Sequence, residues 1–160
     1  LEADAAQVEF SSIPATYEHL QLRFSAACTH TDVVACYFEM NGDTTGTNYR
    51  TARMRGATST ASAGRTDSGA PLLFSFGCTL PAASFGVGFV DIFDYANTNR
   101  FTSALATRGG HNDSSSTPNI VGMNSGLWKN TAAVHTITIT VSSGNMARGS
   151  VFTLYGLNSS

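Results

Sequence analysis

The residue types best suited to chemistry lie together in one short stretch, residues 108–116, which reads RGGHNDSSS. A histidine, an acid and serines are the groups that a serine nucleophile needs for hydrolysis. Functional triads draw these groups from separate elements that fix their geometry, whereas here they are neighbours in one polar segment. No GxSxG elbow accompanies them. We therefore expect a solvated loop, in which His111 and Asn112 are candidate contacts for a partner protein or a glycan.

Two aspartates near the middle of the chain suggest a paired-carboxylate site. Asp91 and Asp94 are three residues apart, so in a continuous strand their side chains would project to opposite faces. They could not readily share a proton or a metal ion, and a structural ion pair or cap is favoured, with Arg100 as the nearest cation in sequence. The polar run that begins at Asp94 and includes Asn97 predicts a turn.

A second turn is predicted where Asn41 and Gly42 precede Asp43. Asn-Gly is a strong hairpin signal, because both residues tolerate positive φ. The carboxylate of Asp43 could ligate calcium, but the alternating oxygen ligands and distant glutamate of a calcium loop are missing. Asp43 is interpreted as a turn residue that bonds its own backbone. The sequence thus predicts no metal site, no cofactor site and no catalytic residue.

Binding is suggested by two arginines and by the single tryptophan. Arg53 and Arg55 share a face of a strand predicted over residues 49–55, where they could pair with acids of a neighbouring subunit or contact phosphates. The formal net charge of −2 favours subunit contact and gives no reason to expect nucleic acid. Trp128 could stack on a sugar, or it could lock its loop onto the core, which is the commoner role of a lone tryptophan.

Composition limits the fold that must position these residues. The 160 residues suit one domain, which we place at residues 8–160 after an arm at residues 1–7. Only 12% of residues are charged, and Gly, Ser, Thr and Asn take their place, which is typical of an all-β protein. No run of 18 apolar residues occurs, so no transmembrane helix is expected. Cys28, Cys36 and Cys78 lack metal-ligand spacing; a Cys28–Cys36 bridge is conceivable, but buried reduced thiols are favoured.

Alternating segments predict the strands. Residues 17–27 and 34–40 alternate apolar and polar side chains, and residues 29–32 between them read as a hairpin loop. Residues 56–70 and 108–116 read as surface loops. No helical period lasts three turns. About eight strands separated by turns predict a single antiparallel β-sandwich of jelly-roll type with little or no helix.

The last quarter of the chain has the clearest pattern. Residues 136–141 alternate threonines with Ile137, Ile139 and Val141, and residues 151–157 form a second strand. We expect these two strands to pair as a hairpin. Its apolar face would form one wall of a sandwich core, shared with Leu20, Leu22, Phe24 and Phe38 and extended by Phe152 and Leu154.

Four segments in this order resemble a β-sandwich module of structural proteins from tailed bacteriophages. They are SSIPATYEHLQLRFSA, YFEMNGDTTGTNYR, VDIFDYANTNRF and the terminal WKNTAAVHTITITVSSGNMARGSVFTLYGL, and the resemblance covers residues 8–157. Their markers are turn and core residues, so the resemblance implies architecture and carries over no binding or catalytic residue.

The resemblance implies a non-enzymatic virion component that assembles in the bacterial cytoplasm. A single module without fibrous repeats favours a capsid decoration, or cement, protein. Its expected partners are major capsid or tail proteins, and copies of itself in a symmetric homo-oligomer such as a trimer, with the arm at residues 1–7 lying across a neighbour. The alternative is a tail or fibre module that binds a host carbohydrate or receptor through Trp128 and the polar loops. Neither nucleic acid nor membrane is an expected partner.

Overall fold

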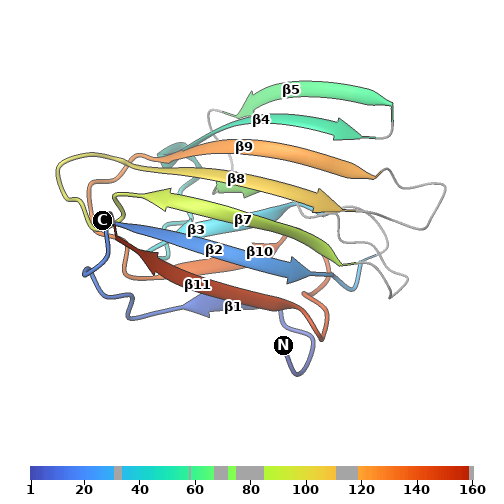
Figure 1. Ribbon diagram of the computed structural model, residues 1–160, viewed down its shortest axis with the longest axis horizontal. Coiled ribbons are helices and arrows are strands. Elements are labelled where there is room, and N and C mark those ends of the chain that lie inside the picture. The colour runs from blue at the N-terminus through green and yellow to red at the C-terminus, as the bar shows by residue number, and fades with distance from the viewer. Residues whose placement is uncertain (31–33, 58, 67–71, 75–84, 111–118, 159–160) are drawn as a thin grey trace.

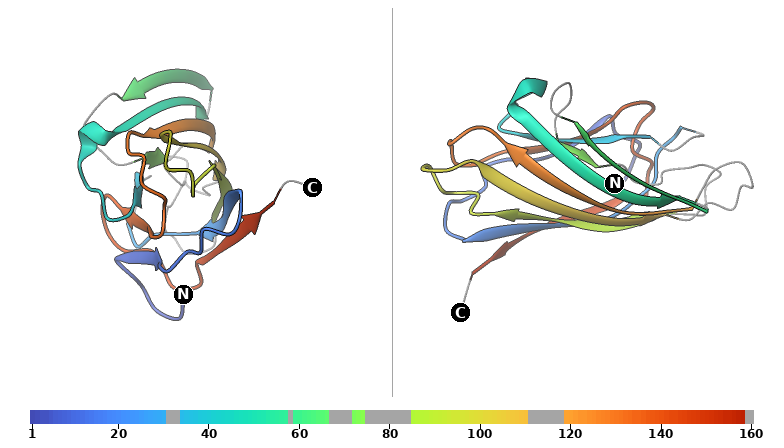
Figure 2. Two further views of the ribbon diagram at one scale, coloured as in Figure 1. Left: turned by 90° about the vertical axis from the view of Figure 1, so that its left-hand side faces the viewer. Right: turned by 90° about the horizontal axis from the view of Figure 1, so that it is seen from above.

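The chain folds into two layers of antiparallel strands (Figures 1 and 2). The structure, a computed structural model, describes residues 1–30, 34–57, 59–66, 72–74, 85–110 and 119–158. These residues form eleven strands and one 3-10 turn at Gly46–Asn48, and none of their helices is long and apolar enough to cross a membrane. The predicted all-β sandwich is confirmed, with more strands than the eight or so expected. The jelly-roll type stays a prediction.

The smaller layer is a four-stranded sheet. In spatial order it contains β1 (Gln7–Phe10), β10 (Ile137–Val141), β3 (Cys36–Met40) and β6 (Leu72–Phe74).

The larger layer is a seven-stranded sheet that curves around the smaller one (Figure 2). In spatial order it contains β11 (Val151–Leu157), β2 (His19–Ala26), β7 (Gly86–Phe93), β8 (Thr102–Gly110), β9 (Ile120–Trp128), β4 (Tyr49–Ala57) and β5 (Thr60–Thr66). Figure 1 shows β5 at one edge of this sheet and β11 at the other.

The core lies between the layers, where the apolar rows of both sheets meet. β2 alternates buried and partly exposed residues along its whole length, which places its leucines and Phe24 inside. The predicted wall is present: Ile137 and Ile139 are fully buried, and Phe152 and Leu154 pack against the same cluster. Alternation therefore identified correctly the core-facing side of β2 and the apolar row of β10.

Both predicted hairpins are wrong, because their strands lie in different sheets. β10 pairs with β1 and β3, whereas β11 pairs with β2. Likewise β2 belongs to the seven-stranded sheet and β3 to the four-stranded one. The connecting segments cross from one layer to the other. Such a crossing lets the apolar faces of two consecutive strands point at each other across the core, which the alternation pattern alone does not distinguish from pairing.

Two segments expected to be loops are strands. β5 lies within residues 56–70, and β8 extends through Arg108 to Gly110. β5 shows no apolar alternation because it is an edge strand whose residues 60–65 are exposed on both faces. The polar stretch at residues 108–116 predicts a solvated loop, yet the side chain of Arg108 points to the inner face of the sheet and is 6% exposed.

The N-terminal segment is held against its own chain, and its predicted contact with a neighbour stays a prediction. Ala5 and Met146 form an antiparallel bridge with hydrogen bonds of 2.9 and 2.8 Å, and Gly149 donates to the carbonyl of Leu1 at 2.9 Å. β1 then joins β10 from Gln7 onward. An arm free to reach a second subunit is therefore not what this segment forms in the monomer.

Candidate functional site

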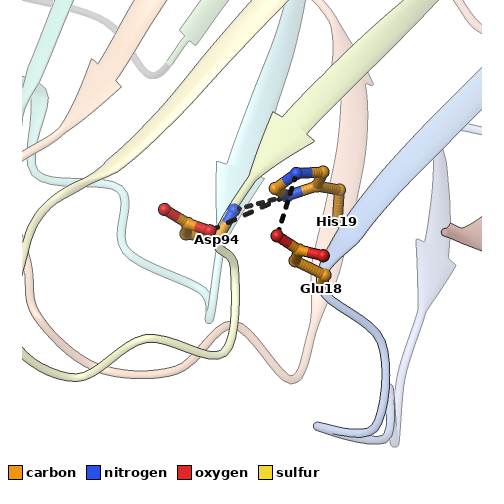
Figure 3. Close-up of side chains that lie close together, drawn as sticks. All are labelled: Glu18, His19 and Asp94. Atoms are coloured by element: carbon orange, nitrogen blue, oxygen red, sulfur yellow. Dashed lines mark hydrogen bonds and ion pairs between the residues drawn. The ribbon is translucent and has the colours of Figure 1, made fainter. Parts of the chain in front are cut away.

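One cluster of His and carboxylate groups lies among the described residues, at the end of the seven-stranded sheet (Figure 3). His19 is the first residue of β2, Glu18 precedes it, and Asp94 follows β7. His19 Nε2 lies 3.8 Å from a Glu18 carboxylate oxygen, and His19 Nδ1 lies 3.8 Å from Asp94 Oδ1. The ring also meets Phe93 edge-on, with 5.4 Å between centroids.

The hydrogen bonds of this cluster favour a structural role. The backbone N–H of Asp94 donates to His19 Nδ1 at 3.1 Å, so the lone pair of that nitrogen is already engaged. The Asp94 carboxylate faces Arg100, whose guanidinium lies 3.4 Å away. A metal ion would have to displace both contacts. The cluster therefore fixes the entrance of β2 against the turn after β7.

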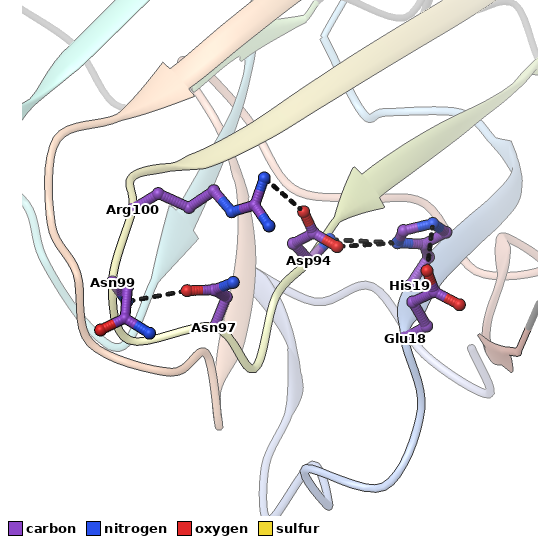
Figure 4. Close-up of polar contacts among 6 residues, drawn as sticks. All are labelled: Glu18, His19, Asp94, Asn97, Asn99 and Arg100. Carbon is purple, nitrogen blue, oxygen red and sulfur yellow. Dashed lines mark hydrogen bonds and ion pairs between the residues drawn. The ribbon is translucent and has the colours of Figure 1, made fainter.

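The turn after β7 contains the predicted residues Asp94 and Asn97 (Figure 4). Asp94 adopts φ 49°, its carbonyl accepts from Asn97 N at 2.9 Å, and Asn97 Oδ1 accepts from Asn99 N at 2.7 Å. Arg100 pairs with Asp94 and not with Asp91, contrary to the expected nearest pairing. Asp91 instead accepts from Gln21 Nε2 at 2.8 Å on the outer face of the sheet. The two aspartates do not form a joint site.

A second polar centre connects the turn after β3 to Trp128. Asn41 and Gly42 have φ of 53° and 68°, and the next residue, Asp43, directs its carboxylate inward. Its Oδ2 accepts from Trp128 Nε1 and from Asn48 Nδ2, both at 2.8 Å, while Oδ1 accepts from Thr45 N at 3.0 Å. Burial opposes ionisation, but these bonds lower the pKa of Asp43 below its ordinary value.

Trp128 cannot serve as a sugar-stacking platform, because its side chain is fully buried. It ends β9 opposite Tyr49, whose hydroxyl donates to the Asp43 carbonyl at 2.8 Å. The indole therefore locks the turn onto the core, which was the other interpretation of this residue. The glycan-binding alternative loses its main support. Its other candidates, His111 and Asn112, lie outside the described residues.

The predicted contact residues Arg53 and Arg55 lie near a third arginine, Arg108, in a segment for which the sequence predicts a loop. All three side chains belong to the inner face of neighbouring strands: Arg53 and Arg55 on β4, and Arg108 on β8. Burial lowers the pKa of Arg108 to about 10, and the charges of Arg55 and Arg53 act in the same direction. In the part of the chain that the structure describes, no carboxylate forms an ion pair with Arg53 or Arg55.

The polarity of β4 reverses along its length. Tyr49 and Thr51 point to the inner face and are buried, as in an ordinary sandwich strand. Arg53 and Arg55 follow on that same face, while Met54 between them points outward and is 61% exposed. No bulge interrupts the pairing with β9, so the register does not explain the change. The apolar side of this half of β4 faces away from the core.

An apolar groove of about 1270 Å³ crosses the outer face at this end of the sheet. Cross-strand neighbours supply its floor: Phe89 lies beside Thr107, Thr107 beside Met123, and Met123 beside Met54. Small residues at the flanking positions leave it open. The exposed apolar side chains of the groove are Met54, Val87, Phe89, Val121 and Met123.

Two cysteines are described, and they do not form a bridge. Cys28 and Cys36 are both buried and are not bonded to each other, and Cys36 Sγ lies 3.1 Å from the carbonyl oxygen of Thr140. Burial and the nearby Cys28 raise the pKa of the Cys36 thiol well above its ordinary value, which favours an inert, protonated side chain. Cys78 lies outside the described residues.

No protein-family model, curated protein or solved structure matches this chain in the comparisons made.

Proposed function

We propose that this chain is a non-enzymatic structural protein of a tailed-phage virion that works by burying its surface against other subunits, most simply as a capsid decoration protein. The proposal combines the sequence resemblance with one structural observation, the exposed apolar face of the seven-stranded sheet. Its partners would be a major capsid or tail protein and further copies of this chain in a symmetric homo-oligomer.

The outer face supports an interface because of its chemistry. Val121 is 66% exposed and Met54 61%, and they are neighbours of Met123 and Phe89 in one continuous patch. Contiguous apolar patches of this kind are uncommon on monomeric soluble proteins and mark binding surfaces. Methionines suit such a surface, because their flexible side chains adapt to a partner. The polar groups described nearby are bonded to one another, as Gln21 is to Arg23 and Asp91.

Imaging of phage particles that contain this chain, at a resolution that separates subunits, tests the proposal. The expected result is a sandwich on the particle with the groove buried against a neighbour. Absence of the chain from purified particles, measured by mass spectrometry, would overturn the virion assignment. A chain found in the particle with this face exposed to solvent would overturn the interface.

A pair of substitutions tests the face without relying on an image. Met54→Asp places a charge in the apolar groove and should reduce particle occupancy at least tenfold while leaving the monomer folded. Ser103→Asp is the matched control, because Ser103 is exposed on the same sheet face, opposite Phe93 and away from the groove. Equal occupancy of the two variants would count against the proposed face.

A further inference from the structure

Among the residues that the structure describes, no strand pairs with the outer edge of β5. β5 is the last strand in the sheet order, and Figure 1 shows it at the margin of the layer. Natural proteins protect such edges with lysines, prolines, bulges or inward charges, because a row of unpaired backbone groups accepts further strands. β5 reads TASAGRT, pairs with β4 without a bulge, and has one charged residue near its end. Its small side chains leave the backbone accessible.

The inner side of this edge is basic. Arg55 Nε donates to Ser62 Oγ at 3.2 Å, so its side chain lies across β5. The side chain of Arg53 also lies across β5, at the neighbouring inward-facing pair. Its Nε would be 3.6 Å from a Cβ atom added at Gly64, the residue opposite Arg53. The buried charge of Arg108 lies behind them on β8. Guanidinium groups above β5 would meet the inner side chains of any strand added to it.

The outer side of the same edge is apolar at Ala61 and Ala63, and Arg65 follows on that side near the end of β5. Ala61 and Ala63 point to this face, beside Gly56 and Met54 of β4, and they continue the floor of the groove as far as the edge. A strand added to β5 would therefore have one face over arginines and the other beside alanines and methionines. Side chains alternate between the two faces of a strand, so each face selects every second residue.

We propose that β5 accepts an extended segment of a partner protein in which acidic and apolar residues alternate, with its acids on Arg53 and Arg55 and its apolar side chains over the outer groove. Strand addition of this kind takes affinity from main-chain hydrogen bonds and specificity from alternate side chains. The inference rests on the proposed interface function and names the partner's chemistry. A second copy does not fit this edge, because pairing β5 with β5 would bring two sets of these arginines together.

A labelled peptide of four Glu-Val repeats tests the inference by fluorescence anisotropy with the intact chain. Two control peptides are used. The first has the same composition in the block order EEEEVVVV, and the second keeps the alternation but has Lys in place of Glu. The alternating peptide should bind at least tenfold more tightly than either control, and binding should slow amide hydrogen exchange in residues 60–66. Equal binding of the block peptide, or no protection of residues 60–66, would overturn strand addition.

Charge reversal identifies the contact. The double change Arg53→Glu and Arg55→Glu should weaken binding of the acidic peptide at least tenfold and improve binding of the lysine peptide. Arg148→Glu, an exposed charge reversal beside the N-terminal segment, should change neither. Binding of a single-stranded oligonucleotide without binding of the peptide would show that the arginines serve phosphates, and would overturn the proposal.

Particle occupancy separates this inference from the proposed function. If the arginine variant enters particles normally while Met54→Asp does not, the outer face is an interface and β5 is not its strand acceptor. If neither change affects occupancy, the interface function itself fails.

Discussion

β2 and β4 lie in the same sheet but have different relations to the core. β2 keeps its apolar residues inside from Leu20 to Ala26, because the four-stranded sheet covers that face. β4 begins in the same way at Tyr49 and then places Arg53 and Arg55 inside and Met54 outside. The comparison shows that the face of a strand on which apolar side chains lie depends on what covers that face. The first half of β4 is covered by this chain, and the second half has arginines on its inner face and an exposed methionine on its outer face.

The largest expected effect lies in the covered half, at Trp128. Trp128→Ala removes a fully buried indole and leaves a cavity, which should lower the free energy of unfolding by about 3–5 kcal/mol. Trp128→Phe keeps most of the packing but leaves Asp43 without one donor, and should cost about 1–3 kcal/mol. Urea unfolding measures both. A loss in unfolding free energy below about 1 kcal/mol for the alanine variant would contradict the tight packing of the covered half around Trp128.

Two glycines provide a matched test of the inner and outer faces. A side chain at Gly88 on the inner face would approach the Thr107 carbonyl oxygen to 2.3 Å and the Phe24 ring to 2.5 Å. Gly88→Ala should therefore cost about 3 kcal/mol, at the upper end for overpacking. At Gly56, on the outer face, the nearest contact is Val121 at an ordinary 3.5 Å, so Gly56→Ala should change stability by less than about 0.5 kcal/mol.

Thermal unfolding of the two alanine variants decides the point. If they were equally stable, the inner face would be as open as the outer one, and the contrast between the faces would be wrong.

The next effect depends on pH and concerns Asp43. Its pKa is lower in the folded chain than in the unfolded chain, where it is near the ordinary value of about 4. The ionised carboxylate therefore stabilises the fold at pH values above about 4, and this contribution is lost as the pH falls through the folded pKa. Asp43→Asn replaces one of the two acceptor oxygens by an NH₂ group and removes the negative charge. The N–H groups of Trp128 and Asn48 would then face either a donor or an uncharged oxygen. The substitution should cost about 1.5–3 kcal/mol at neutral pH.

Chemical denaturation from pH 7 to about pH 2 measures the difference between wild type and Asp43→Asn, because the scan must pass below the lowered pKa of Asp43. The two curves should converge on the acidic side, where the wild-type carboxyl is protonated. A gap that stays constant over this range would mean that the charge of Asp43 is not what holds the indole.

The covered region could be predicted from sequence better than the open one. Strict alternation at residues 20–26 identified the inner face of β2, because one side of that strand is buried and the other is not. In β10 the apolar row at Ile137 and Ile139 also faces the core, although Thr138 between them is buried as well. Strand partners could not be predicted in the same way: β10 and β11 have complementary apolar rows whether they pair in one sheet or face each other across the core. The alternation within one strand does not say which of the two layers the next strand joins.

The open region was missed for a related reason. β5 consists of small and polar residues, which resemble a loop because neither face of the strand is buried by this chain. The polar stretch that begins at Arg108 predicts a loop, yet the Arg108 side chain lies buried on the inner face behind Arg53 and Arg55. Both errors occur at the end of the sheet that we propose as an interface, and the contribution of a partner is not encoded in the alternation of one strand.

The smallest expected effect measures the charge of this open region directly. Arg53 is exposed and lies near Arg55 and the buried Arg108, so Arg53→Gln should relieve repulsion and stabilise the monomer by up to about 0.5 kcal/mol at low salt. The gain should fade as salt rises, because the screening length shrinks to about 10 Å at 0.1 M. Arg100→Gln is the control of opposite sign: it removes the ion pair with Asp94 and should destabilise slightly at low salt. If Arg53→Gln destabilised the monomer instead, the arginine would be satisfied within this chain, and the inner face of β5 would need no acidic partner.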